Sequence, residues 1–196
     1  MPTTLKNKLQ IDNQVTQLVL TRFLQNEIGK AGFSRAVLGL SGGIDSALSC
    51  YLAVQALGAA NVLALRLPYR ASSAESLSHA DMVIEALGIP SETVEITAMV
   101  EPLFAASPEI SAHRKGNVMS RARMVVIFDR SADWNGLVVG TSNKTELMLG
   151  YGTIFGDLAS AVNPIGDLYK TQVRQLARAM GVPGSGNAPW IRKVGS

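Results

Sequence analysis

The chain has 196 residues, 47% of them apolar and 17% charged, a composition that supports the core of one folded domain and excludes a disordered chain. The net charge of +3 suits anionic small molecules at least as well as nucleic acid, and the single cysteine excludes an internal disulfide or a thiolate zinc cluster. No apolar run approaches a membrane span and the first residues lack a signal-peptide core, so we expect a cytoplasmic protein without membrane or nucleic-acid partners.

Apolar residues of the first predicted helix recur every four positions in two rows. The rows are Ile11, Val15, Val19 and Phe23, and Leu20, Leu24 and Ile28. Together they form a wide apolar stripe, which is typical of a helix packed on a core. The stripe is wider than one sheet needs for its cover.

Strands and helices are expected to alternate through the rest of the chain. Continuous apolar runs predict strands at 36–40, 61–67, 92–96 and 136–140. Periodicity and capping signals predict helices at 47–57, from a Ser72–Glu75 capping box to about Leu87, at 115–132, and at 172–180 after a Thr171 cap. This order predicts an α/β fold with a doubly wound, mainly parallel, Rossmann-like sheet and helices on both faces. We expect one domain over residues 1–183 and an irregular tail over 184–196.

A burst of small polar residues, Ser41–Ser46, stands where the first strand gives way to a helix. Ligands of doubly wound sheets bind at this kind of junction. Gly42 and Gly43 leave room for a phosphate, and the helix N-terminus attracts an anion. Asp45 is explained if a Mg²⁺ ion lies between it and the phosphates. The alternative is a tight turn in which Asp45 or Ser46 only caps the helix.

The stretch "SGGIDS" resembles the signature loop of the ATP pyrophosphatases, and four further stretches resemble NAD synthetases within that group. They are "LGAANVLALRLPYRASSAESL", "KGNVMSRARM", "GTSNKTELMLGYGTIFGD" and "NPIGDLYKTQVRQLARAMGVP". The resemblance covers roughly residues 33–183. It implies a fold of the adenine nucleotide alpha-hydrolase type.

The resemblance also implies an ATP-dependent carbon–nitrogen ligase that uses ammonia and Mg²⁺. ATP, the co-substrate, adenylates the carboxylate of deamido-NAD, and ammonia then displaces AMP to give NAD. Family members are homodimers, so we expect a homodimer here, and the ammonia comes from solution or from a separate partner. The open alternatives are another ATP-pyrophosphatase amidotransferase and a truncated or degenerate ATP-binding module without catalysis.

Residue by residue, the resemblance implies an ATP site, a metal site and a substrate site. The ATP contacts are Gly39, Leu40, Ser41, Gly42, Gly43, Ile44, Asp45, Ser46, Thr141 and Lys170. The metal ligands are Asp45 and Glu146, and the deamido-NAD contacts are Arg121, Asp157 and position 154. No residue is an obvious general base.

Each of these side chains also has a simpler interpretation. Glu146 forms a capping-box pattern with Asn143, Lys170 and Arg121 could be solvated helix residues, and Asp157 could be a loop acid. Arg123 lies two residues beyond Arg121 and therefore points to another side of the helix.

The sequence departs from the family pattern in two places. Ile154 stands where ammonia-using members commonly have a lysine, and Ala161 replaces an aspartate. The residues after 183 match none of the family's usual C-terminal region. The first departure bears on substrate binding more than on the ATP site, whereas the family's C-terminal region covers the ATP and helps to complete the site.

Overall fold

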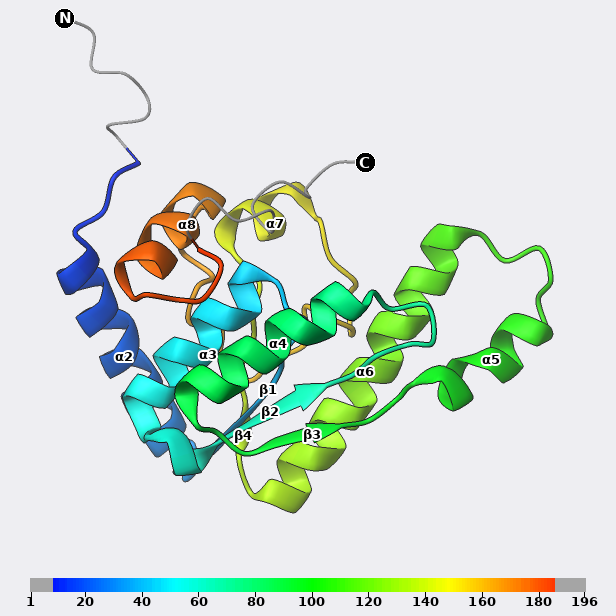
Figure 1. Ribbon diagram of the computed structural model, residues 1–196, viewed down its shortest axis with the longest axis horizontal. Helices are drawn as coiled ribbons and strands as arrows, with labels where there is room; N and C mark the ends of the chain where they lie inside the picture. Colours follow the sequence, from blue (N-terminus) through cyan, green and yellow to red (C-terminus); the bar gives the residue numbers. More distant parts are fainter. Residues whose placement is uncertain (1–8, 186–196) are drawn as a thin grey trace, which may run out of the picture.

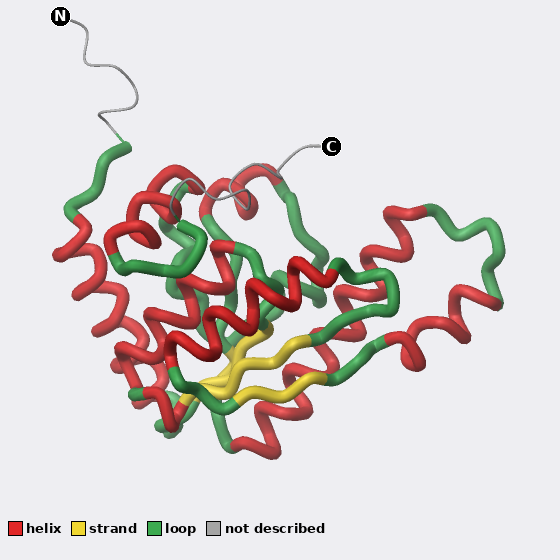
Figure 2. Tube along the Cα trace, viewed as in Figure 1, coloured by secondary structure: helices red, strands yellow, loops and turns green. Residues whose placement is uncertain are grey.

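The computed structural model describes residues 9–185, and its centre is a parallel sheet (Figures 1 and 2). Within those residues the sheet has four strands in the order β3-β2-β1-β4. Their bounds are β1 Ala36–Gly39, β2 Val62–Arg66, β3 Ser91–Thr93 and β4 Leu137–Val138. The register pairs Ala36 with Val62 and with Leu137, and Ala64 with Ser91. The predicted parallel sheet is confirmed.

Helices cover both faces of the sheet, as predicted (Figure 1). One face carries α2 Asn13–Lys30, α3 Ile44–Leu57, α4 Ala74–Leu87 and α8 Lys170–Ala179. The other face carries α6 Ala112–Trp134, against which α5 Thr97–Ala105 packs, and the short helix α7 Lys144–Leu149 follows β4. A 3₁₀ turn, η1 Ala59–Asn61, leads into β2.

The core lies between the sheet and these two helix layers. Leu38 of β1 packs with Leu24, Leu48 and other residues of the α2, α3 and α8 layer. On the opposite face, Val37 and Leu65 pack with Val126 of α6. Since β1 and β2 are covered on both sides, they read as continuous apolar runs rather than alternating ones.

Several element bounds differ from the prediction. The N-cap of α4 is Ser73, whose side chain accepts from the Ser76 N–H, so the Ser72–Glu75 capping box is wrong by one residue. The last helix begins at Lys170 with Tyr169 as N-cap, which places Thr171 inside it. Helix α5 was not predicted, because its Pro102 stands where proline usually ends a helix.

The strand predicted at 92–96 ends early, at Thr93 in β3. The chain still runs beside β2, since Val94 and Ile96 donate backbone hydrogen bonds to Arg66 and Pro68. The irregular tail predicted for 184–196 lies outside the described residues from 186 onward.

The two apolar rows of α2 differ in how deeply they are buried. Leu24 and Ile28 are fully buried against the sheet layer, whereas Val15 and Val19 are 56% and 57% exposed. The helix therefore carries an apolar face that its own fold does not cover. Among residues 9–185, no helix combines the length and hydropathy that crossing a bilayer requires.

Candidate functional site

The loop between β1 and α3 leaves the N-terminus of α3 open. The N-cap residue is Gly43, and no side chain caps the helix. The Ser46 hydroxyl accepts from the Ser41 N–H (3.2 Å) and donates to the Gly43 carbonyl (2.9 Å). The alternative in which Asp45 or Ser46 only caps the helix is therefore wrong. No side chain therefore occupies the N-terminus of α3, an arrangement that suits an anion.

Gly42 brings this loop against the start of α4. Its φ of +79° is a left-handed conformation, and a Cβ at this position would lie 2.2 Å from the Ser76 carbonyl oxygen. Only glycine fits both conditions without strain. The start of α4 and the loop from Ser41 to Ser46 thus form one continuous wall.

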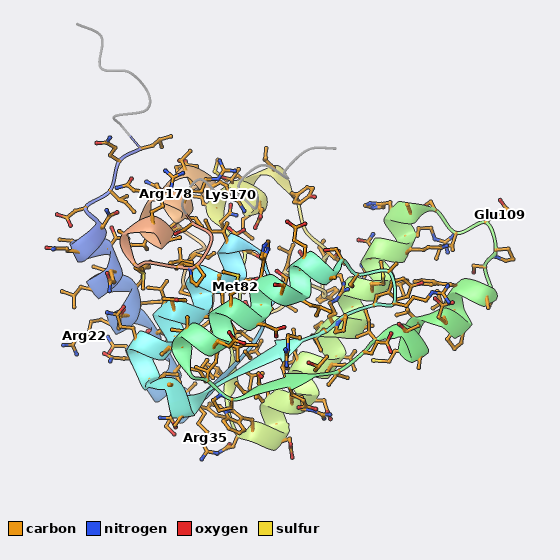
Figure 3. The ribbon with its side chains drawn as sticks, viewed as in Figure 1. Arg22, Arg35, Met82, Glu109, Lys170 and Arg178 are labelled. Atoms are coloured by element: carbon orange, nitrogen blue, oxygen red, sulfur yellow. The ribbon has the colours of Figure 1, made fainter. Side chains whose placement is uncertain are left out.

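Three charged side chains from separate parts of the chain meet beside this wall. Lys170, the first residue of α8, contacts Asp45 Oδ2 through its ammonium and lies 3.7 Å from Glu146 Oε1. Asn143 Nδ2 donates to Asp45 Oδ1 over 2.9 Å. Figure 3 labels Lys170 where α7 and α8 lie side by side. The two predicted metal ligands therefore converge on one cation.

Asn143 organises the same cluster through the start of α7. Its side chain accepts from the Glu146 N–H, and a Glu146 carboxylate oxygen accepts from the Asn143 N–H, each over 3.1 Å. The capping box predicted as the simpler interpretation of Glu146 is thus present. The other carboxylate oxygen, Oε1, still points to Lys170, so capping and cation contact coexist.

The electrostatics of Glu146 reflect this crowding. Burial raises the pKa of its carboxyl, and the Asp45 carboxylate raises it further. The Asn143 backbone N–H and the Lys170 ammonium act in the opposite direction. The pKa of Glu146 stays raised although Lys170 is close, so the charged form of the carboxyl is still disfavoured. A cation with a higher charge would stabilise that charged form further.

Asp45 and Glu146 border a cavity of about 570 Å³ at the carboxyl ends of the strands, whereas Lys170 and Asn143 are not among its lining residues. Polar residues of its lining include Ser41, Gly43, Asp45, Ser46, Thr141 and Glu146. Apolar residues of its lining include Gly39, Leu65, Leu67, Met124, Ile127 and Val138. The volume falls within the range usual for ligand sites, and the mixed lining suits a ligand with a flat apolar part and an anionic part.

The predicted substrate contacts lie on the α6 side. Asp157 is part of the cavity wall, and its Oδ1 accepts from the Ser120 hydroxyl (2.7 Å) and the Thr153 N–H (2.8 Å). Arg121 is exposed and donates from Nε to the Ile154 carbonyl oxygen over 3.2 Å. The Ile154 side chain is 64% exposed.

Arg123 is a cavity residue that the sequence did not single out. Its Nε donates to the Leu67 carbonyl oxygen over 2.9 Å, which fixes the guanidinium against the wall at the end of β2. Burial lowers the pKa of Arg123, and the Asp157 carboxylate opposes that effect. The spacing from Arg121 indicated a different helix side, but only the packing of α6 shows which side faces the cavity.

The donor set fits Mg²⁺. This ion binds through one or two carboxylates and completes its shell with phosphate oxygens and water. Asp45 and Glu146 already share one cation, and Asp45 lies in the first turn of α3, at the open N-terminus of that helix. Within residues 9–185 no cluster of three or more His, Cys, Asp or Glu side chains offers a fuller protein cage.

Comparison with known sequences decides the family. A sequence model described as NAD synthase matches residues 16–185. The chain belongs to the NAD synthase family. It is 61% identical over 175 residues to the NH(3)-dependent NAD(+) synthetase of Chlorobium phaeovibrioides, covering 89% of this chain and 63% of that relative. The chain thus spans less than two thirds of that relative's length.

Solved structures of related enzymes show the same fold. The NH3-dependent NAD synthetase of Campylobacter jejuni, in complex with a nitrate ion, matches with a TM-score of 0.85 at 40% identity, over 89% of this chain and 76% of that one. The NMN synthetase of Francisella tularensis matches with a TM-score of 0.83 at 32% identity, over 89% and 73%.

Proposed function

We propose that this chain catalyses the ATP-dependent amidation of deamido-NAD to NAD, with ammonia as the nitrogen donor. One observation carries the proposal. Asp45, from the first turn of α3, and Glu146, from α7, converge on a single cation beside an uncapped helix N-terminus. This arrangement suits a metal–triphosphate complex, and the 61% identical relative is named an NH(3)-dependent NAD(+) synthetase.

ATP binding is assigned to the loop and the cavity beside it. The open N–H groups of α3, with the Ser41 and Ser46 hydroxyls, bind the triphosphate, and the apolar lining around Leu65 and Ile127 receives the adenine. Thr141 and Lys170 contribute to the phosphate end. Asp45 and Glu146 would hold Mg²⁺, which would neutralise the phosphate charge when bound.

The chemistry requires a carboxylate to become an acylating agent. A substrate carboxylate oxygen attacks the α-phosphorus of ATP, the bond to the β-phosphate oxygen breaks, and pyrophosphate leaves. Ammonia then attacks the acyl carbon, the bond to AMP breaks, and a proton passes to solvent. Lys170 supplies a mobile positive charge for the phosphates, and the cavity orients the two reactants and limits water.

Deamido-NAD is assigned to the α6 side of the cavity. Asp157, fixed by Ser120 and Thr153, and the guanidinium of Arg123 line that end. Arg121, on the same helix, is exposed and donates a hydrogen bond to the Ile154 carbonyl. Because position 154 lacks the lysine common in ammonia-using members, arginine is the cation available here for the substrate's anionic groups.

We further propose that the chain works as a homodimer. The exposed apolar residues Val15, Leu18 and Val19 on α2, between 56% and 58% exposed, form a face suited to a second copy. The cytoplasmic location expected from the sequence stays a prediction.

Product analysis tests the proposed reaction. The protein is incubated with ATP, Mg²⁺, ammonium and deamido-NAD, and NAD, AMP and pyrophosphate are quantified by mass spectrometry and a coupled assay. Equal amounts of the three products are expected, with loss of about 100-fold or more in Asp45→Asn. The matched control is Asp167→Asn, because the Asp167 side chain is 99% exposed and pairs only distantly with Lys144.

The alternative functions predict different products. Amidation of xanthosine monophosphate but not of deamido-NAD would indicate another amidotransferase. Amidation of nicotinate mononucleotide in preference to deamido-NAD would place the chain with the enzyme type named for Francisella. ATP binding without pyrophosphate release would identify a non-catalytic module.

A further inference from the structure

Lys170 occupies the position between two carboxylates that a divalent cation would need. We infer that its ammonium is the resident cation of the Asp45–Glu146 pair and leaves that pair when the metal–triphosphate complex enters. The inference rests on the proposed function, since it concerns the same site. It adds an exchange step in which one cation replaces another.

The geometry allows one cation between these carboxylates at a time. The Lys170 ammonium contacts Asp45 Oδ2 and lies 3.7 Å from Glu146 Oε1. The three side chains are only 16% to 27% exposed, so water screens them poorly. A divalent ion bound to the same oxygens would lie within a few ångströms of the ammonium, and two such charges repel strongly at that separation.

Only the lysine side chain has to move. The Lys170 backbone N–H donates to Thr145 Oγ1 over 3.0 Å, which ties the start of α8 to α7. Asn143 fixes the other oxygen of Asp45, and the capping box fixes Glu146. The ammonium, in contrast, sits at the end of a flexible four-carbon stem. The carboxylates can therefore stay in place while the lysine swings away.

The displaced ammonium can pair with the phosphates of a bound triphosphate. Asp45 lies in the first turn of α3, so phosphates bound at the open N-terminus of this helix come close to Lys170. The nucleotide thus carries the metal ion into the site and draws the Lys170 ammonium away from the carboxylates in the same binding step. Binding of metal and nucleotide is then coupled, and metal alone binds weakly.

Titration with Mn²⁺ in the absence of nucleotide tests the exchange. Free Mn²⁺ is followed by electron paramagnetic resonance with the full chain and with Lys170→Met. Removal of the competing charge is expected to lower the Kd for Mn²⁺ by about tenfold or more. Lys170→Arg, which keeps the charge, and Lys144→Met, which removes a lysine outside the cluster, are expected to bind Mn²⁺ as weakly as the unmodified chain.

Thermal melting of the same variants provides an independent readout. Without its lysine the carboxylate pair is unneutralised, so Mn²⁺ is expected to raise the Tm of Lys170→Met more than that of the unmodified chain. Lys170→Gln replaces Lys170→Met if the latter does not fold. An unchanged Kd together with an unchanged Tm response in the neutral variants would overturn the inference.

These outcomes separate the inference from the proposed function. Normal NAD formation by the unmodified chain with unchanged Mn²⁺ affinity in Lys170→Met refutes the exchange alone. Tighter Mn²⁺ binding in that variant, with no product from deamido-NAD in the unmodified chain, supports the exchange and refutes the proposed reaction.

Discussion

Replacement of Gly42 by alanine should damage both the fold and nucleotide binding. The φ of +79° costs an alanine roughly 1–2 kcal/mol. The new Cβ would also lie 2.2 Å from the Ser76 carbonyl oxygen, and relief of such overpacking costs roughly 1–3 kcal/mol. The combined loss of roughly 2–5 kcal/mol corresponds to a fall in Tm of roughly 5–15 °C for a chain of this size.

Gly43→Ala is the matched control. Gly43 has an ordinary φ of −86°, and the nearest atom to an added Cβ is Ser41 Oγ at 3.3 Å. A side-chain hydroxyl can rotate away, so the expected Tm change is below roughly 3 °C. Differential scanning calorimetry gives the Tm, and isothermal titration with ATP gives the affinity. If Gly42→Ala melts as Gly43→Ala does, the described contact between the loop and α4 is incorrect.

Three further predictions concern the core, the substrate side and the assembly. Burial raises the pKa of Cys50 to about 12 from 9.0, so above pH 9 the unfolded chain loses the thiol proton while the folded chain keeps it. The free energy of unfolding, relative to that of Cys50→Ala, should therefore fall by about 1.4 kcal/mol per pH unit above pH 9. If urea denaturation gives the same difference between the two proteins at pH 8 and at pH 10, this prediction is wrong. Ser120→Ala removes both hydrogen bonds to Asp157 and should raise the KM for deamido-NAD several-fold with a Tm change under about 3 °C; an unchanged KM in steady-state assays counts against the assigned substrate side. Val19→Lys places a charge on the exposed apolar face of α2 and should convert a dimer to a monomer in light scattering, whereas a monomeric unmodified chain contradicts the proposed assembly.

The sequence predicted the layers of this fold well because buried strands consist almost entirely of apolar residues. Residues 36–39 and 62–65 are apolar throughout since helices cover them on both faces. The buried Cys50 was likewise expected from its place on an apolar helix. The bounds of helices were predicted less accurately where a local sequence signal competes with packing. Pro102 lies inside α5, and the N-cap of α4 is Ser73 rather than Ser72.

The site was predicted in part, for a different reason. Motifs pointed to Asp45 and Glu146 as ligands of one metal ion and to Lys170 as an ATP contact, but the contact of Lys170 with both acids joins residues up to 125 positions apart and needs the fold. Arg123 was passed over because its neighbour Arg121 matched the family motif. Which of the two faces the cavity depends on how α6 packs against β1 and β2, and periodicity alone does not fix that rotation.

The most direct test of the central claim is a crystal structure with Mg²⁺, deamido-NAD and a non-cleavable ATP analogue. We expect the triphosphate across the N-terminus of α3, a magnesium ion bridging Asp45, Glu146 and the phosphates, and Lys170 turned away from the two carboxylates. A triphosphate bound elsewhere, or a metal that touches neither carboxylate, would contradict the account.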